Sequence, residues 1–147
     1  MSQNQGITSN HRIRFGDCDP AGIAYFPRLL ALVDNAVEDW LIATIGVDRA
    51  AMHLDQHFGL PTVDLTTHFT QPCRLGETLG ITIVATHVGA TSITLAATAK
   101  VDGQPRFSAR LVQVLISLET GKPCTWPNGW RGAIAPMPVR QQEVSPT

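Results

Sequence analysis

Residues 15–27 read Phe-Gly-Asp-Cys-Asp-Pro-Ala-Gly-Ile-Ala-Tyr-Phe-Pro, and an amphipathic segment follows them as far as Gly46. The stretch places two acids and a thiol among two glycines and two prolines, immediately before a predicted helix. A helix N-terminus has free backbone N–H groups and a partial positive charge, so it can polarise a carbonyl oxygen. This composition is unsuited to a core and is typical of a functional loop.

A long helix is predicted from Pro27 to Gly46. Pro27 suits the first turn, where its missing N–H is not needed, and Gly46 is a typical C-terminal stop. Asp34 falls at the edge of the apolar stripe, an unusual place for a solvated charge, whereas Asp39 lies on the polar side. We expect this helix to pack across a sheet. The stripe consists of residues that recur at helical spacing: Leu29, Leu30, Val33, Val37, Trp40, Leu41 and Thr44.

Strands are predicted on both sides of this helix, because apolar residues there alternate with polar ones. Residues 47–58 can hold a short helical piece, and Asp102-Gly103 is a strong hairpin signal. The last strand becomes nearly all apolar, as a central strand covered on both faces would. The pattern predicts an α+β fold, with one antiparallel sheet of about five strands and the long helix against it. The predicted strands are 11–15, 62–70, 78–88, 93–99 and 107–118.

Length and composition limit the possible functions. The 147 residues fit one domain, with flexible tails expected at 1–7 and about 137–147. A formal net charge of −1 predicts no nucleic-acid surface. The number and spacing of the three cysteines match neither a disulfide framework nor a zinc site. Because the N-terminus lacks an apolar signal and no apolar run reaches the roughly 20 residues that a membrane span needs, we expect a cytoplasmic protein without membrane contact.

The loop and the start of the helix together resemble a known family. Residues 15–23, with Tyr25, Phe26, Pro27 and residues 32–34, are similar to the 4-hydroxybenzoyl-CoA thioesterase branch of the hotdog-fold thioesterases. The order of elements follows that family to about Leu118. The resemblance implies a curved sheet around the helix, hydrolysis of an aromatic acyl-CoA without a cofactor, and a homodimer or homotetramer with the pocket at a subunit interface.

In that family the second acid of the D-x-D-P motif does the chemistry, and here this residue is Asp19. A carboxylate can attack a thioester to give a mixed anhydride that water hydrolyses, or it can act as a general base towards water. The family implies the nucleophilic route, but the residues by themselves leave both open. The alternative is that Asp17 and Asp19 are turn residues whose side chains bond the backbone.

Other residues of the stretch receive supporting roles. We expect Asp17 to cap the loop or orient Asp19, since two adjacent ionised acids with one task would oppose each other. Cys18 is a rival nucleophile, although the sequence shows no base for it. By analogy, the backbone N–H of Phe26 or of a neighbour polarises the substrate carbonyl.

The resemblance also implies substrate contacts, which we assign to Asp17, Gly22, Tyr25 and Asp34. Tyr25 and Phe26 would line the acyl pocket or, alternatively, pack in the core. Asp34 matches the family residue that contacts the phenolic hydroxyl of the 4-hydroxybenzoyl substrate. Its position at the edge of the apolar stripe suits a buried hydrogen-bond acceptor. The alternative for Asp34 is a carboxylate paired with an arginine.

One departure from the family concerns the CoA phosphates. Where relatives have a basic run, this chain has Gly89-Ala90-Thr91-Ser92. The CoA contacts must therefore differ. Acyl-carrier-protein thioesters, other aryl or short aliphatic acyl groups, and a non-catalytic binding role all stay open. The available cations are Arg28, Arg74, Lys100, Arg106 and Arg110.

A metal site receives little support from the sequence. His53 and His57 would share a helix face at their i, i+4 spacing, but no third ligand accompanies them. The sequence therefore predicts no metal.

Overall fold

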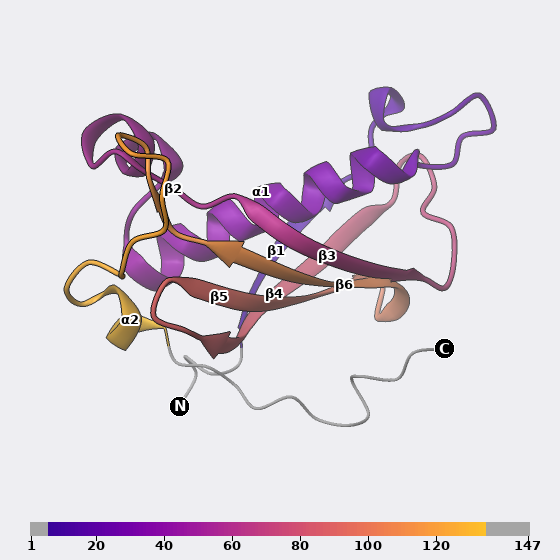
Figure 1. Ribbon diagram of the computed structural model, residues 1–147. Helices are drawn as coiled ribbons and strands as arrows, with labels where there is room; N and C mark the ends of the chain where they lie inside the picture. The colour runs from indigo at the N-terminus through magenta and orange to yellow at the C-terminus, as the bar shows by residue number, and fades with distance from the viewer. Residues whose placement is uncertain (1–5, 135–147) are drawn as a thin grey trace.

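The computed structural model describes residues 6–134, and they form an antiparallel five-stranded sheet with a long helix against it (Figure 1). This confirms the predicted α+β class. The strand order is β1-β4-β5-β6-β3, so that β1 and β3 are the two edges. The strands are β1 (Ile7–Arg12), β3 (Thr62–Phe69), β4 (Thr78–Val88), β5 (Ser92–Val101) and β6 (Gln104–Val114).

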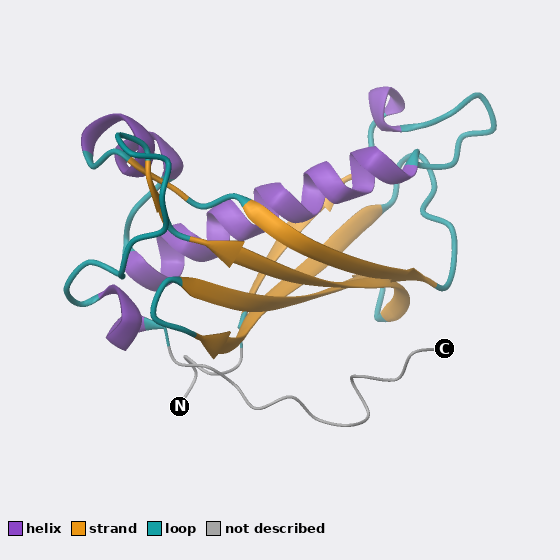
Figure 2. Ribbon diagram, viewed as in Figure 1, coloured by secondary structure: helices purple, strands orange, loops and turns teal. Residues whose placement is uncertain are grey.

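The helix α1 (Phe26–Ile45) agrees with the predicted helix to within one residue at each end. Pro27 lies in its first turn, and Gly46 ends it in a left-handed conformation at φ 73°. Glycine reaches this φ without a Cβ clash, and its N–H caps the Ile42 carbonyl. Figure 2 shows the helix lying across one face of the sheet. It buries five of the seven residues of the predicted apolar stripe, together with Ala36, while Leu30 and Thr44 are only partly buried. The five are Leu29, Val33, Val37, Trp40 and Leu41.

The core lies between α1 and the sheet, chiefly where the helix crosses β1 and β4. Alternate side chains of β4 point into it, because successive residues of a strand face opposite sides. Leu79, Ile81 and Ile83 are fully buried, while Gly80 and Thr82 between them are partly exposed. Leu95 on β5 continues the same buried layer.

Several strand boundaries differ from the sequence-based prediction. β1 begins at Ile7 and ends at Arg12, so residues 13–15 pass into the loop and Ile7, expected in a tail, pairs with Ile83. The predicted central strand 107–118 is next to an edge and is not covered on both faces, because Arg110 is exposed. It stops at Val114. The expected hairpin is present, with Asp102 and Gly103 both at positive φ.

The small elements lie at the two ends of α1. The 3-10 turn η2 (Phe15–Asp17) precedes it, and the π-helical turn η3 (Ala51–Asp55) follows in the segment predicted to hold a helical piece. β2 (Phe58–Gly59) pairs with β7 (Ile116–Ser117), and α2 (Trp130–Ala133) comes last. The remaining expected tail residues, 1–5 and 137–147, lie outside the described residues. Within 6–134, no helix is long and apolar enough to cross a membrane.

Candidate active site

The loop from Asp17 to Tyr25 is held between η2, α1 and the segment 73–77 by backbone hydrogen bonds. Tyr25 N–H donates to the Asp17 carbonyl at 2.8 Å, which closes the loop at the start of the helix. Ala24 N–H donates to the Cys73 carbonyl at 2.7 Å, and Leu75 N–H donates to the Gly22 carbonyl at 3.0 Å. The loop is therefore a fixed platform at the N-terminus of α1.

Asp19 is the most tightly bonded residue of this platform. Its N–H donates to the Ile23 carbonyl at 2.9 Å, and its carbonyl accepts the Gly22 N–H at 3.0 Å. Its Oδ1 accepts the N–H groups of Ala21 at 2.9 Å and Ile23 at 3.2 Å. These are the bonds expected of a turn residue, and they leave Oδ2 without a hydrogen-bond partner in the described part of the chain. The residue is exposed, so Oδ2 is accessible to a substrate.

Gly22 makes this turn possible. Its φ is +77°, a left-handed conformation that strains any residue with a Cβ, although a Cβ there would meet no heavy atom within 4 Å. The requirement for glycine is therefore conformational and not steric. Gly22 holds the turn that carries Asp19, and its own carbonyl is occupied by Leu75.

Asp17 lies in a very different environment, although it is only two residues away. It is 7% exposed, and its Oδ2 accepts the Arg14 N–H at 2.9 Å. Its Oδ1 accepts from Arg28 Nε at 3.3 Å. Asp17 thus caps η2 and ties the loop to the first turn of α1, as the capping interpretation predicts.

The N-terminus of α1 has a free donor beside this loop. The Phe26 N–H has no acceptor among the described residues, whereas the next donor, Arg28 N–H, bonds the Tyr25 carbonyl at 2.8 Å. Pro27 has no N–H. Phe26 is thus the free backbone donor at the helix start, where the macrodipole favours negative charge. This is the arrangement that an oxyanion requires.

Cys18 is poorly suited to act as a nucleophile. Partial desolvation, followed by the nearby charges of Asp17 and Asp19, raises the pKa of its thiol. Its Sγ lies 3.5 Å from the Arg14 carbonyl oxygen, to which it donates. The thiolate needed for attack is therefore disfavoured.

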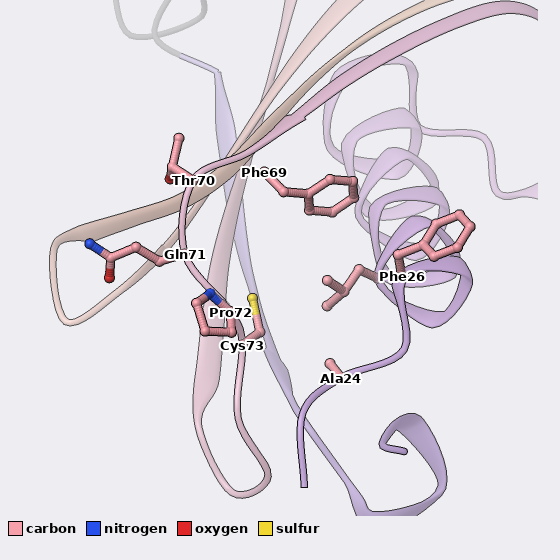
Figure 3. Close-up of a pocket in the computed structure, with 8 residues that line it drawn as sticks. Ala24, Phe26, Phe69, Thr70, Gln71, Pro72 and Cys73 are labelled. Atoms are coloured by element: carbon pink, nitrogen blue, oxygen red, sulfur yellow. The ribbon is translucent and has the colours of Figure 1, made fainter. Parts of the chain in front are cut away.

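An apolar cavity of about 250 Å³ opens between the start of α1 and the end of β3 (Figure 3). Ala24, Phe26 and Leu29 line one side, and Phe69 with residues 70–73 lines the other. In Figure 3 Phe69 points towards the helix, while Gln71 points away from it. The Phe26 ring is 57% exposed and the Tyr25 ring 56%, so both lie at a surface and not in the core.

Asp34 lies about two turns further along α1 and is paired with an arginine. Arg49 Nη1 donates to its Oδ2 at 2.6 Å and Nη2 to its Oδ1 at 3.0 Å, a bidentate ion pair. The Asp34 side chain is 53% exposed, so it is not the buried acceptor that the apolar stripe suggested. The pair borders a second cavity of about 340 Å³, which His53 and Thr62 also line.

The histidine pair is not arranged as the sequence spacing implied. His53 is in η3, but His57 lies beyond that turn with φ +60°, so the two do not share a helix face. Within residues 6–134, no group of three or more His, Cys, Asp or Glu side chains is placed to hold a metal ion.

Two of the expected cations are engaged elsewhere. Arg106 makes a bidentate pair with Glu77, at 2.7 and 2.9 Å, and its side chain is only 13% exposed. Arg110 lies 3.7 Å from Asp64 on the neighbouring strand. Sequence reasoning missed Arg49 and the cavity wall at residues 69–73, because neither has a local motif and both reach the site only through the fold.

The chain is similar to thioesterases in sequence. Residues 13–134 match the model of a family described as the thioesterase-like superfamily. A 1,4-dihydroxy-2-naphthoyl-CoA hydrolase from Synechococcus elongatus is 29% identical over 109 residues, which cover 74% of this chain and 79% of the relative. A 4-hydroxybenzoyl-CoA thioesterase from Pseudomonas sp. strain CBS-3 is 47% identical over 38 residues, covering 26% of this chain and 27% of that protein.

The fold is shared with a solved structure of the same superfamily. A thioesterase superfamily protein from Jannaschia sp. CCS1 superposes with a TM-score of 0.84 at 26% sequence identity. The match covers 93% of this chain and 96% of the other. The arrangement of the sheet around α1 is therefore the hotdog arrangement that the motif implied.

Proposed function

Because this chain belongs to the thioesterase-like superfamily and is an acyl-CoA thioesterase of the hotdog fold, we propose that its substrate carries an aromatic acyl group and that Asp19 is the catalytic residue. The observation that carries the proposal is the state of Asp19. Four hydrogen bonds fix the residue and its Oδ1, while Oδ2 has no hydrogen-bond partner among the described residues. The free Phe26 N–H is at the other end of the same closed loop. A positioned carboxylate and a free backbone donor on one loop suit attack on a thioester carbonyl.

In this mechanism the Phe26 N–H donates to the thioester carbonyl oxygen and stabilises the negative charge that develops on it. Asp19 Oδ2 forms a bond to the carbonyl carbon, the carbon–sulfur bond breaks, and CoA leaves as a thiolate that takes up a proton. Water then hydrolyses the mixed anhydride and restores the carboxylate. If Asp19 instead acts as a general base, Oδ2 accepts a proton from the attacking water.

An aromatic acyl group is supported by the cavity next to this site. Phe26 and Phe69 present aromatic surface on its two sides. Two relatives have names that specify aromatic acyl-CoA substrates, 1,4-dihydroxy-2-naphthoyl-CoA and 4-hydroxybenzoyl-CoA. We assign Tyr25 to the rim of the same cavity because its ring lies 5.8 Å from that of Phe26.

Asp34 and Arg49 border the cavity of about 340 Å³ and not the one at Phe26. We therefore assign the pair to recognition of a polar ring substituent from across the subunit interface proposed below. The carboxylate accepts from a hydroxyl, and the guanidinium donates to an oxygen of the same ring. Because Arg49 holds both Asp34 oxygens, a substrate hydroxyl must share this acceptor with it. The pair therefore favours a ring that offers both a donor and an acceptor.

We also propose a homo-oligomer, a dimer or a tetramer, with the pocket at a subunit interface. The edge strand β3 supports it, because Val63, Leu65 and Phe69 are 60%, 42% and 46% exposed. An apolar edge strand with unpaired backbone groups is a ready site for pairing with a second copy.

The test is to measure hydrolysis of a panel of acyl-CoA substrates, with release of the free thiol as the readout. The panel contains benzoyl-, 4-hydroxybenzoyl-, dihydroxynaphthoyl-, phenylacetyl- and short aliphatic acyl-CoA. We expect the aromatic thioesters to be preferred, and Asp19→Asn to lower kcat by about 100-fold or more while substrate still binds. Asp102→Asn is the matched control, because asparagine suits the positive φ of that hairpin turn.

The same panel tests the substrate assignment. Asp34→Ala should reduce kcat/KM for hydroxylated aryl substrates about 10-fold and change benzoyl-CoA much less. An equal loss on every substrate would make the Asp34–Arg49 pair structural. Unchanged hydrolysis in Asp19→Asn would overturn the proposed mechanism.

A further inference from the structure

Gln113 is a polar side chain placed in the hydrophobic core. It lies on β6, is 1% exposed, and faces the same side of the sheet as the buried Leu111. Its cross-strand neighbour on β5 is the fully buried Ile93, and on β3 it pairs with Thr62. An amide in such a place needs hydrogen-bond partners within the protein, because burial removes the water that would otherwise bond it.

The amide of Gln113 is bonded at one end only. Its Nε2 donates to Thr62 Oγ1 at 3.1 Å, whereas the buried Oε1 has no partner among the described residues. A buried carbonyl without a donor lowers stability, and an apolar side chain of the same size would avoid this loss. The strands do not need the amide to hold them together, because the Val114 N–H donates to the Pro61 carbonyl at 3.1 Å. The role of Gln113 therefore lies in its bond to Thr62.

Thr62 connects this buried amide to the second cavity. It is exposed, and it lines the cavity of about 340 Å³ together with Asp34, Arg49 and His53. Because Gln113 occupies a lone pair of Oγ1, the hydroxyl keeps its proton for donation to another group. Within residues 6–134 that proton has no acceptor. The cavity thus has a hydroxyl donor in addition to a carboxylate and a guanidinium.

Most of the remaining wall of this cavity is apolar. Leu60, Pro61, Ile116 and Leu118 contribute to it, from the segment before β3 and from β7 and the residue after it. A few polar groups on an apolar wall are typical of a small-molecule pocket, where the polar groups provide specificity.

We infer that Thr62, oriented by Gln113, is a specificity-determining residue that donates a hydrogen bond to a second oxygen substituent of the acyl ring. The inference rests on the proposed function and its subunit interface, in which Asp34 and Arg49 bind the first substituent. The substrate class that it selects is a dihydroxylated aryl acyl-CoA over a monohydroxylated one. Gln113 does not touch the substrate and is a positioning residue: it fixes the hydroxyl rotor, so that less freedom is lost on binding.

The test compares substrates that differ by one hydroxyl group. Wild type and Thr62→Val are assayed on 4-hydroxybenzoyl-CoA and on the 2,4- and 3,4-dihydroxybenzoyl thioesters. We expect wild type to prefer at least one dihydroxy isomer to 4-hydroxybenzoyl-CoA. The ratio of the two kcat/KM values should fall about 10-fold in Thr62→Val, which keeps the shape and removes the donor. Thr62→Ser keeps the hydroxyl and should retain most of the ratio.

Gln113→Met tests the positioning role, since methionine has a similar size and no amide. The same ratio should fall about three-fold. It should fall no further when this substitution is added to Thr62→Val, because Gln113 acts only through Thr62. The free energy of unfolding in urea should stay unchanged or rise, because an unpaired buried oxygen is removed. A glutamine with a merely structural role would instead lower the unfolding free energy and leave the ratio unchanged.

Thr98→Val is the matched control. Thr98 is exposed on β5 between the buried Ala97 and Ala99, so it faces the other side of the sheet. The same atoms change there, and the ratio should not. Calorimetric binding of the free dihydroxybenzoic and 4-hydroxybenzoic acids is a readout without turnover, and Thr62→Val should lower the preference for the dihydroxy acid.

Several results would overturn the inference. They are a wild type that prefers neither dihydroxy isomer, an equal loss on all three thioesters in Thr62→Val, and additive effects of the two substitutions. A loss accompanied by a smaller species in light scattering would make Thr62 an interface residue and would also overturn it. Failure of the proposed function appears differently, as hydrolysis that persists in Asp19→Asn, whereas the binding of the free acids does not depend on Asp19.

Discussion

Two aspartates separated by one residue show how the fold divides one residue type into two roles. Asp17 is 7% exposed and is bonded to Arg14 and Arg28. Asp19 is exposed and bonded only to backbone N–H groups through one of its carboxylate oxygens. The first arrangement uses the charge to hold structure, and the second leaves an oxygen free for chemistry.

Substitutions at these two residues should therefore have opposite consequences. Asp17→Ala removes a buried acceptor from two donors and should lower the free energy of unfolding by about 2 kcal/mol, measured by urea denaturation. Asp19→Asn keeps the Oδ1 acceptor of the turn, so its stability should stay within about 0.5 kcal/mol of wild type while hydrolysis is lost. A destabilisation in Asp19→Asn as large as that in Asp17→Ala would contradict this division.

Cys18 gives a second prediction at the residue scale. The raised pKa of its thiol keeps it protonated at neutral pH, so Cys18→Ala should retain kcat within about two-fold. Alkylation of wild type at pH 7 should be slow and should accelerate as the pH rises towards the raised pKa. Loss of hydrolysis in Cys18→Ala, with an unchanged unfolding transition, would favour a thiol mechanism.

At the scale of elements, one ion pair holds the segment that forms the far wall of the cavity. Arg106 on β6 binds Glu77 at the entry to β4, and its Nη1 also donates to the Pro72 carbonyl at 2.8 Å. Glu77 accepts the Arg74 N–H at 2.7 Å as well. These side-chain bonds add to the backbone bonds that tie the connection 70–77 to the sheet, such as that from the Thr70 N–H to the Arg106 carbonyl at 2.9 Å.

This pair predicts a pH-dependent contribution to stability. Hydrogen bonding from Arg106 lowers the pKa of Glu77 from its ordinary value of 4.5. A carboxyl with a lowered folded pKa stabilises the fold above its unfolded pKa, and the contribution is lost as pH falls through the folded value. Glu77→Gln should therefore lower the free energy of unfolding by about 1 kcal/mol at pH 7. This is less than a fully buried pair would contribute, because a quarter of the Glu77 side chain is exposed to solvent.

The measurement is urea denaturation of both proteins from pH 7 to pH 3. The difference in unfolding free energy between wild type and Glu77→Gln should be constant above about pH 5, shrink below pH 4.5 and disappear once Glu77 is protonated. Glu119→Gln, at an exposed site after β7, is the control. A difference that grows as the pH falls would contradict the assignment.

At the scale of the whole molecule, the two edges of the sheet differ. β1 presents Ser9 and His11, joined at 2.7 Å, on the same side as Ile7. β3 instead presents apolar side chains that are exposed in the single chain, and Phe69 also lines the cavity beside the loop. A second copy packed on β3, as proposed above, would bury these side chains.

If β3 is the interface of the proposed oligomer, Leu65→Lys should weaken the association. Leu65 is 42% exposed on β3, and a charge there would be desolvated in a paired edge. Light scattering after gel filtration should show a smaller species, and kcat/KM on the aryl-CoA should fall with it. Leu54→Lys, at a site that is 74% exposed on η3, should change neither. An unaltered mass for Leu65→Lys would remove β3 as the interface.

Most of the fold could be predicted because its signals are local. The period of α1, its stop at Gly46 and the hairpin at Asp102-Gly103 depend on neighbouring residues, and all three are confirmed. Strand ends and neighbours were less predictable. Residues 107–118 look like a central strand, but β6 lies next to the edge because β3 pairs on its outer side.

In the candidate site, too, the local features could be predicted from the sequence and the long-range contacts could not. The sequence by itself determined the loop, its two acids, its glycine and the helix start behind it, because these are contiguous and their turn and cap chemistry is local. Only the tertiary structure decided that Arg49 binds Asp34, that Arg106 is occupied by Glu77, and that Arg14 and Arg74 flank the loop. Such pairings join residues distant in sequence, and they depend on strand register and on how α1 crosses the sheet.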